Sequence, residues 1–346
     1  MGTLIKVGIL TAPKIEYELR AHTFILKNVR IGIGFHWDRY EDQEFAGSLE
    51  IRNNADGTRT AINTIDLEDY LCSVISSEMN ANSPMELLKA HAVISRSWAI
   101  RAMQKPNHDG FHVCADDHCQ RYEGLRRMNE RAVQAVRETT GQVLTYNGEI
   151  CDCRYYKCCG GRTEIWRTCW EDIDVPYIQS VECNYCNLTS HSAAVSRLTS
   201  ILNDYDQETK DFRDWRVTYT AEELSEIIRT KSGIDFGEII DLIPLKRGAS
   251  GRIYELKIVG TKHTEVIGKE LKIRLWLSRT CLYSSWFEVE KSIQSSAVRF
   301  QLSGHGWGHG AGLCQIGAAV MASEGHKYEE ILNYYYVGSQ LSAPAR

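Results

Sequence analysis

The sequence predicts a mixed α+β protein in which a helical and β-rich core and a smaller α+β lobe form a cleft. Its 346 residues, 43% hydrophobic and 25% charged, suffice for one large or two medium-sized domains. Short apolar stretches separated by turn-forming residues fill residues 3–56, which is typical of several strands. At Asp66 the apolar spacing changes to that of a helix. Both kinds of element are therefore expected in one chain.

The N-terminal segment, residues 1–58, is predicted to be rich in strands. Its apolar stretches are LIKVGIL, HTFILKNVRIGIGF and GSLEIRNN. Asp66 can then cap a helix that ends near Glu78 and Met79, because apolar residues recur at helical spacing at Leu67, Leu71, Val74 and Ile75.

A second helix is expected to begin directly afterwards. Ser83 is predicted as its N-cap, Pro84 as its first helical residue and Glu86 as the capping-box glutamate. The following LLKAHAVISRSWAIRAM is apolar almost all round, so this helix should be buried. The core, residues 59–189, is completed by a helix over NERAVQAVRETTG and by a hairpin that turns at Asn147-Gly148.

The smaller lobe is assigned to residues 190–300. It holds one amphipathic helix, AEELSEIIRTKSG, and two predicted strands, RIYELKIVG and ELKIRLWL. Residues 301–346 contain a glycine-rich segment followed by two helices, LCQIGAAVMASEG and YEEILNYYY, which are expected to return to the core.

The charge balance excludes some classes of partner. A formal net charge of −5 and a pI near 6.1 argue against non-specific binding to nucleic acid or to an anionic membrane. No apolar run is long enough to cross a bilayer, and the first residues lack the pattern of a signal peptide. We therefore expect either a cytoplasmic protein or an envelope protein whose leader has been removed.

The segment GHGWGHGAGLCQIGA, residues 304–318, has glycine at every second position from Gly304 to Gly312. In an extended chain His305, Trp307 and His309 would share one side, and the other side would carry no side chain. This pattern predicts a rigid aromatic wall whose bare backbone a ligand can approach closely.

Glu78 is a candidate general acid. It lies in the last turn of a predicted helix, where the partial negative charge of the helix end should raise the pKa of a carboxyl group. Lys89 and Arg96 lie seven residues apart on one face of the next helix, and an arginine in an apolar helix usually meets a carboxylate or an anionic ligand. Glu78, the substrate or a structural ion pair are all possible partners of Arg96.

Four motifs in this order carry a family resemblance: SSEM with the helix after it, HVCADDHCQRYEG, YYKCCGGRTE, and the glycine segment. From about residue 60 onward the chain resembles the stage II sporulation protein D (SpoIID/LytB amidase-enhancer) family. The resemblance implies a peptidoglycan lytic transglycosylase, a lyase that cuts between N-acetylmuramic acid and N-acetylglucosamine and leaves 1,6-anhydro ends. The catalytic acid of that family matches Glu78.

The resemblance also implies a set of glycan contacts and a zinc site. Cations in the cleft would meet the carboxylates of glycan strands or muropeptides, and the glycine segment would form the opposite wall, so the expected substrate-binding residues are Lys89, Arg96, Tyr156, Lys157, Arg162, His305, Trp307, His309 and Gln315. Zinc in such a family site would be held by Cys114, His118 and Cys119, with His108 or alternatively His112 as fourth ligand. Four protein ligands leave no open position, so this zinc is expected to be structural.

Two other functions stay open. The amidase-enhancer branch of the family allows a non-catalytic peptidoglycan-binding module whose partner is a cell-wall amidase. A zinc-dependent hydrolase that uses the loop at residues 108–119 would require an open coordination position.

The remaining cysteines have several possible states. Most of them are expected to be plain buried thiols: Cys151, Cys153, Cys158, Cys159, Cys169, Cys183 and Cys186. Cys183 and Cys186 can alternatively pair with each other or bind a second metal together with Cys169. Cys314 is a weak candidate for a thiol nucleophile, because His305 and His309 are near in sequence but no third orienting group is apparent.

Overall fold

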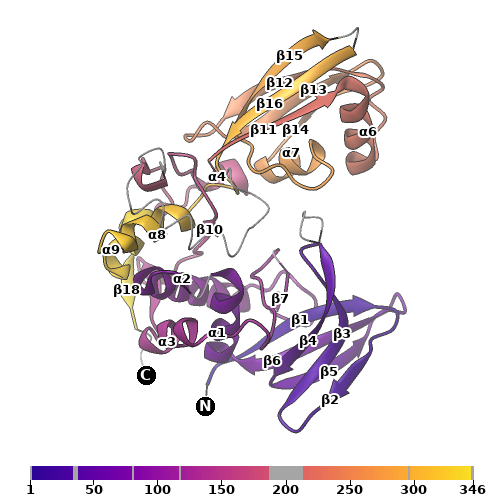
Figure 1. The fold of residues 1–346 in the computed structure, drawn as a ribbon. Helices are drawn as coiled ribbons and strands as arrows, with labels where there is room; N and C mark the ends of the chain where they lie inside the picture. The colour runs from indigo at the N-terminus through magenta and orange to yellow at the C-terminus, as the bar shows by residue number, and fades with distance from the viewer. Residues whose placement is uncertain are drawn as a thin grey trace. The chain divides into compact units, whose positions relative to one another are not determined.

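The computed structural model describes residues 2–33, 38–79, 82–116, 118–186, 213–294 and 297–343 (Figure 1). The chain divides into two compact units. The first contains residues 1–153, 326–330 and 339–346, and the second contains residues 154–325 and 331–338. The architecture is mixed α+β, as the sequence predicts. The predicted start of the smaller lobe at residue 190 lies outside the described residues.

Within the residues described, the first unit has three small sheets. One sheet has the order β5-β6-β1-β7 and is antiparallel except for β7, which runs parallel to β1. Its strands are β1 (Leu4–Ala12), β5 (Ser48–Asn53), β6 (Arg59–Asp66) and β7 (Val113–Cys114). The second sheet joins β2 (Tyr17–Leu19), β3 (Thr23–Ile31) and β4 (Arg39–Ala46). The third joins β8 (Val143–Tyr146), β9 (Glu149–Ile150) and β18 (Gln340–Ser342).

Three helices pack beside these sheets: α1 (Leu67–Glu78), α2 (Met85–Gln104) and α3 (Glu130–Glu138). The predicted cap of α1 is confirmed, because the Asp66 side chain accepts a hydrogen bond from the backbone N–H of Glu68. The hairpin prediction is also confirmed, with Asn147 and Gly148 both at positive φ between β8 and β9.

The predicted capping box of α2 is wrong. Pro84 has extended dihedral angles and is itself the N-cap, so the helix begins at Met85 and no side chain caps it. Glu86 instead accepts a hydrogen bond from the backbone N–H of Tyr328, at 2.9 Å, far along the chain. A tertiary partner thus replaces the local one.

The second unit contains three further sheets and several short helices. Its sheets are β10-β17, β11-β16-β15 and β12-β13-β14, with strands β10 (Tyr155–Tyr156), β11 (Asp214–Thr220), β12 (Ile239–Arg247), β13 (Ile253–Gly260), β14 (Thr264–Ile267), β15 (Phe287–Gln294), β16 (Ala297–His305) and β17 (Leu313–Cys314). The helices are α4 (Trp166–Cys169), the 3₁₀ helix η1 (Asn184–Cys186), α6 (Ala221–Ser232), α7 (Glu270–Trp276), α8 (Gln315–Ser323) and α9 (Tyr328–Tyr335), the last of which begins in the first unit.

The predicted strand ELKIRLWL is a helix, α7. Its apolar residues alternate in sequence, but Leu271 is 47% exposed whereas Ile273 and Leu277, four residues apart, are fully buried. Glu270 and Arg274 form an ion pair across the same helical turn. The helical period places the buried positions against the lobe's apolar core, and this outweighs the alternation.

The glycine segment is not a regular extended strand beyond His305. Four glycines have φ between +74° and +99°, namely Gly306, Gly308, Gly310 and Gly312. The bare side of the backbone faces the protein itself: a Cβ at Gly312 would lie 2.1 Å from the Arg154 carbonyl oxygen. The expectation that these glycines leave room for a ligand is therefore wrong. Backbone of residues 154–159 fills that room at Gly306 and Gly312, and the side chains of Tyr156 and Arg252 fill it at Gly308 and Gly310.

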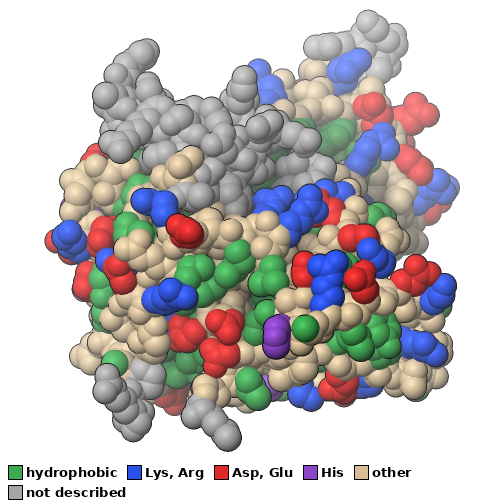
Figure 2. Space-filling view, turned by 60° about the horizontal axis from the view of Figure 1, so that its bottom comes forward, with side chains coloured by type: hydrophobic (Ala, Val, Ile, Leu, Met, Phe, Trp, Pro, Cys, Tyr) green, Lys and Arg blue, Asp and Glu red, His purple; other side chains and the backbone are tan. Residues whose placement is uncertain are grey.

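Charged side chains of both signs are mixed on the face drawn in Figure 2. Oppositely charged side chains also pair directly, as Arg30 does with Asp38 at 2.7 Å and Lys27 with Asp42 at 2.9 Å. Among the described residues, no helix has the length and apolar composition needed to cross a membrane.

Replacing Gly312 with Ala should destabilise the second unit strongly. The alanine would combine a left-handed backbone, which costs about 1–2 kcal/mol, with a contact that the Arg154 backbone cannot relieve, so we expect a loss of about 3 kcal/mol or more in unfolding free energy. The matched control is Gly233→Ala, where φ is +74° and no atom lies within 4 Å, and about 1–2 kcal/mol should be lost. Urea denaturation measures both, and equal losses would contradict the steric argument.

Candidate functional site

Glu78 is the last residue of α1 and is partly buried. Its Oε1 accepts a hydrogen bond from the backbone N–H of Arg121, at 3.1 Å. The carboxylate is therefore held between the end of α1 and the segment that follows Cys119, and the residue as a whole is only partly buried.

Further bonds attach the same segment along α1. The Ser73 hydroxyl donates to the Gly124 carbonyl at 2.6 Å, and the Ser77 hydroxyl accepts from the Glu123 N–H at 3.4 Å. Tyr70 donates to the Gln120 side chain at 3.2 Å. The polar residues on this face of α1 thus form hydrogen bonds with polar groups of a segment that has no regular secondary structure of its own.

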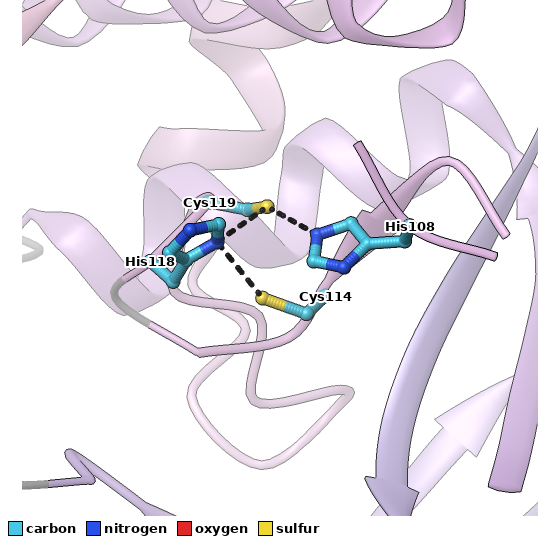
Figure 3. A group of neighbouring side chains, drawn as sticks. All are labelled: His108, Cys114, His118 and Cys119. Atoms are coloured by element: carbon cyan, nitrogen blue, oxygen red, sulfur yellow. Dashed lines mark hydrogen bonds between the residues drawn. The ribbon is translucent and has the colours of Figure 1, made fainter. Parts of the chain in front are cut away.

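Immediately before this segment, four side chains converge: His108, Cys114, His118 and Cys119 (Figure 3). Their donor atoms all lie within 4.8 Å of one another. Cys119 Sγ is 3.2 Å from His108 Nε2 and 3.6 Å from His118 Nδ1, and Cys114 Sγ is 3.9 Å from that Nδ1. The pKa of the Cys114 thiol is lowered, mainly because the thiol is hydrogen-bonded to Cys119.

This donor set fits zinc. Two sulfurs and two imidazole nitrogens within reach of one point match a tetrahedral zinc site, with Zn–S bonds of about 2.3 Å and Zn–N bonds of about 2.0 Å. Of the two alternatives for the fourth ligand, His108 belongs to the group. His112 Nδ1 accepts a hydrogen bond from the backbone N–H of Lys6, at 3.0 Å, and lies outside it.

A pocket of about 1140 Å³ adjoins this group. Residues of β1 and β3 line it together with His108, Cys114 and His118. Glu78 is not among the lining residues. The pocket therefore reaches three of the four side chains, and Cys119 and Glu78 do not line it.

Arg96 has an internal partner that the sequence did not reveal. Its fully buried guanidinium forms two hydrogen bonds with the carboxylate of Glu68, at 2.8 and 2.6 Å, and two more with the carbonyls of Val136 and Gln142. Lys89 pairs with Glu138 at 2.6 Å. These two cations face α3 and the residues after it. Of the three partners left open for Arg96, the structural ion pair is confirmed, and neither Glu78 nor the substrate is its partner.

The three aromatic residues of the glycine segment have different environments. His305 is exposed and lies 2.5 Å from Asp214, with its ring beside Trp286. Trp307 is 8% exposed and packs edge-on against Tyr283. The predicted common wall is therefore absent from residues 305–309, because the positive-φ glycines turn successive side chains in different directions.

His309 holds the segment internally. Its Nε2 donates to the Tyr155 carbonyl at 3.0 Å, and its Nδ1 accepts from the Ala311 N–H at 3.1 Å, which defines a neutral tautomer. Burial first, and then the charge of Arg154, lower the pKa of His309 well below its usual value. Protonation of Nδ1 would break the bond to Ala311.

The other predicted contacts are also in the second unit. Lys157 and Arg162 are partly exposed, whereas Tyr156 and Gln315 are buried. Arg162 lies 4.0 Å from Glu182, to which its backbone is bridged. Glu78, Lys89, Arg96 and the metal-binding candidates all belong to the first unit.

Sequence reasoning missed several residues that build the site. In the sequence, Glu68 is recognisable only as an acidic residue in the first turn of α1, which does not predict its pairing with Arg96. The Arg121 contact with Glu78 uses the backbone N–H, so no residue type predicts it. Trp286 and Asp214 meet His305 only through the pairing of β16 with β15 and β11. Each of these contacts joins residues far apart in sequence.

Comparison with known proteins gives consistent matches. A family model described as Stage II sporulation protein matches residues 55–146, and one described as a domain of unknown function matches residues 164–312. An uncharacterized protein of Brachyspira hyodysenteriae is 30% identical over 296 residues, which is 85% of this chain and 71% of that protein. Stage II sporulation protein D of Bacillus subtilis is 26% identical, with coverage of 82% and 76%. The amidase enhancer of B. subtilis is 27% identical, with coverage of 79% and 40%.

Removing the charge of Arg96 should cost far more stability than removing that of Lys89. Arg96→Met leaves the Glu68 carboxylate and buried carbonyls without donors, so we expect a loss of about 3–5 kcal/mol in unfolding free energy. Lys89→Met breaks a partly exposed pair and should cost about 1 kcal/mol or less. Denaturant unfolding tests the difference; a loss below 1 kcal/mol in Arg96→Met would contradict the structural role.

Proposed function

Because the chain belongs to the stage II sporulation protein D family, we propose that it acts on the cell wall as a peptidoglycan lytic transglycosylase. The bond cleaved would be that between N-acetylmuramic acid and N-acetylglucosamine in glycan strands. The product would carry a 1,6-anhydro end.

The position of Glu78 carries this proposal. It is a partly accessible carboxylate at the C-terminal end of α1, within the part of the chain that the family model matches. The N–H of Arg121 fixes the position of its carboxylate. A single positioned carboxyl group can donate and then accept a proton.

The proposed reaction needs only this one carboxyl group. Protonated Glu78 donates its proton to the glycosidic oxygen as the bond from that oxygen to the anomeric carbon breaks. The 6-hydroxyl oxygen of the same muramic acid attacks the anomeric carbon, and the Glu78 carboxylate takes the hydroxyl proton. No water is consumed, and the glutamate ends the cycle protonated as it began.

In the second unit, the accessible residues of the predicted set are candidates for glycan contacts of their own. Lys157 and Arg162 can meet lactyl or peptide carboxylates of the glycan, and His305 can donate to a sugar hydroxyl. Trp307 and His309 are better suited to hold the segment that carries His305.

The group of His108, Cys114, His118 and Cys119 would hold zinc in a closed four-ligand site. Bound zinc would supply a structural cross-link. Cys119 lies two residues before Arg121, so the cross-link would stabilise the segment whose N–H contacts Glu78. A closed site does not favour the zinc-dependent hydrolase.

A second candidate function is a non-catalytic peptidoglycan-binding module that enhances a cell-wall amidase. The similarity to the amidase enhancer of B. subtilis favours it. Its partner would be an amidase, and Glu78 would then have no chemical role.

Glu78→Gln should abolish formation of anhydro ends. The amide cannot donate an acidic proton or accept one as a base, so we expect turnover to fall by about 10²–10⁴-fold with little change in melting temperature. Mass spectrometry of products from purified glycan strands is the measurement. Glu130→Gln, which alters an exposed carboxylate in the first turn of α3, is the matched control and should keep full activity. Wild-type turnover in Glu78→Gln would end the proposed role of Glu78, whereas the absence of anhydro ends from the wild-type chain itself would favour the amidase enhancer.

Removing the proposed zinc should destabilise the first unit. Cys114→Ser is expected to lower bound zinc by one ion per chain and to reduce the melting temperature, because a closed metal site contributes folding free energy. His112→Ala should keep the ion, since His112 bonds to Lys6 instead. Metal analysis with calorimetry measures both. If chelation removed turnover without any change in fold or melting temperature, the structural role would be refuted.

A further inference from the structure

A second group of metal-type side chains lies in the other unit. The sulfur atoms of Cys159, Cys183, Cys186 and Cys314 all lie within 4.8 Å of one another, and all four residues are fully buried. Cys159 Sγ and Cys186 Sγ lie 3.1 Å apart. None of these residues belongs to the site described above.

Local structure directs the four thiols toward one point. Cys159 follows β10. Cys183 directly precedes η1 and Cys186 ends it, and this tight turn places the two cysteines, three residues apart, on one side. Cys314 ends β17 and is the N-cap of α8, where its sulfur accepts the Gly317 N–H at 3.3 Å. Three separate stretches of chain thus meet at the cluster.

Hydrogen-bond donors surround the sulfurs. The backbone N–H of Cys159 donates to Cys314 Sγ at 3.3 Å, and that of Gly161 donates to Cys159 Sγ at 3.4 Å. The Tyr335 hydroxyl lies 3.3 Å from Cys183 Sγ. A neutral buried thiol is a weak acceptor that needs no such partners, whereas thiolates bound to a metal are stabilised by them.

Positive charge is also present beside the cluster. The guanidinium of Arg252 is fully buried and donates two hydrogen bonds, both at 3.3 Å, to the carbonyl of Cys159. Cys314 is the N-cap of α8, so the partial positive charge of that helix end also lies beside the cluster. Four thiolates around a divalent ion carry a net charge of about −2, and these two features compensate part of it.

We propose that Cys159, Cys183, Cys186 and Cys314 bind one zinc ion in a tetrahedral, purely structural site. With Zn–S bonds of about 2.3 Å, the sulfurs of such a site lie about 3.8 Å apart, which all six distances can satisfy after small rotations. Two disulfides would instead require two separate close pairs. Soft thiolates in a tetrahedron select zinc, or iron, over hard cations such as magnesium.

The other buried cysteines of this unit are outside the set. Cys169, the predicted partner of Cys183 and Cys186, donates its thiol to the His309 carbonyl at 3.3 Å instead. Cys158 is adjacent to Cys159. The pKa of the Cys158 thiol is raised, mainly by a hydrogen bond to Cys186. Its sulfur is not among the four that lie within 4.8 Å of one another.

The ion would close a long loop in the chain. Cys159, Cys183 and Cys186 precede β11, and Cys314 follows β16, so the metal would join the two ends of the lobe that lies between them. It would also fix the pairing of β10 with β17 and the start of α8. All four positions are taken by protein sulfur, so no site remains for a substrate.

Metal analysis of the full chain, purified under reducing conditions, tests this inference. Cys186→Ser should contain one zinc ion fewer per chain than the wild type and melt about 5 °C lower or more. The matched control, Cys169→Ser, removes another buried thiol of the same unit and should keep the wild-type metal content.

A second measurement does not depend on the folding of Cys186→Ser. The Cys114→Ser chain, in which the first proposed zinc site is broken, should still take up one Co²⁺ ion, with the intense thiolate-to-cobalt absorption of a four-sulfur site. This result would hold even if the transglycosylase proposal failed, because it involves neither Glu78 nor substrate.

Three outcomes would overturn the proposal. They are an unchanged metal content in folded Cys186→Ser, the absence of cobalt uptake by folded Cys114→Ser, and disulfides among the four cysteines in the mass spectrum of the unreduced wild-type chain. If the wild-type chain contained one iron ion and Cys186→Ser had lost it, the four-sulfur site would be supported, with iron instead of zinc as its ion.

Discussion

The hydrogen bond from the Arg121 amide to Glu78 is the contact on which the proposed chemistry depends. It forms because the segment after Cys119 lies along α1, where serine hydroxyls and Tyr70 satisfy its polar groups. The four converging side chains stand at the head of this segment. The Glu78 position, the surface of α1 and the metal-binding candidates are therefore parts of one local structure.

The second unit is organised by close backbone packing rather than by an open binding wall. Glycines at positive φ let residues 304–312 pair with residues 154–164, and His309 adds hydrogen bonds at the same place. The four buried cysteines lie where these two stretches and η1 meet. The residue types that appear suited to ligand binding in the sequence thus mainly serve internal cohesion, and only His305 of the three aromatic residues remains exposed.

Buried charges follow the same principle in both units. Arg96 is satisfied by Glu68 and carbonyls, and Arg252 by the carbonyls of Gly308 and Cys159. Glu164 accepts bonds from the Ala249 and Ser250 amides. A charge removed from water must find such partners, so burial of a charged residue in this fold indicates a structural network unless part of the group remains accessible, as it does for Glu78.

The sequence by itself determined the α+β class, the cap and end of α1, the hairpin at Asn147-Gly148 and the family, because periodicity, capping and turn signals act within a few residues. It also placed Cys114, His118 and Cys119 in one loop. Only the tertiary structure decided that Glu68 partners Arg96, that ELKIRLWL is helical, that His108 rather than His112 joins the loop, and that Cys159 and Cys314 join Cys183 and Cys186. The physical reason is that a buried polar or sulfur atom is satisfied by whatever the fold brings near it, and nearness in space leaves no mark on local sequence.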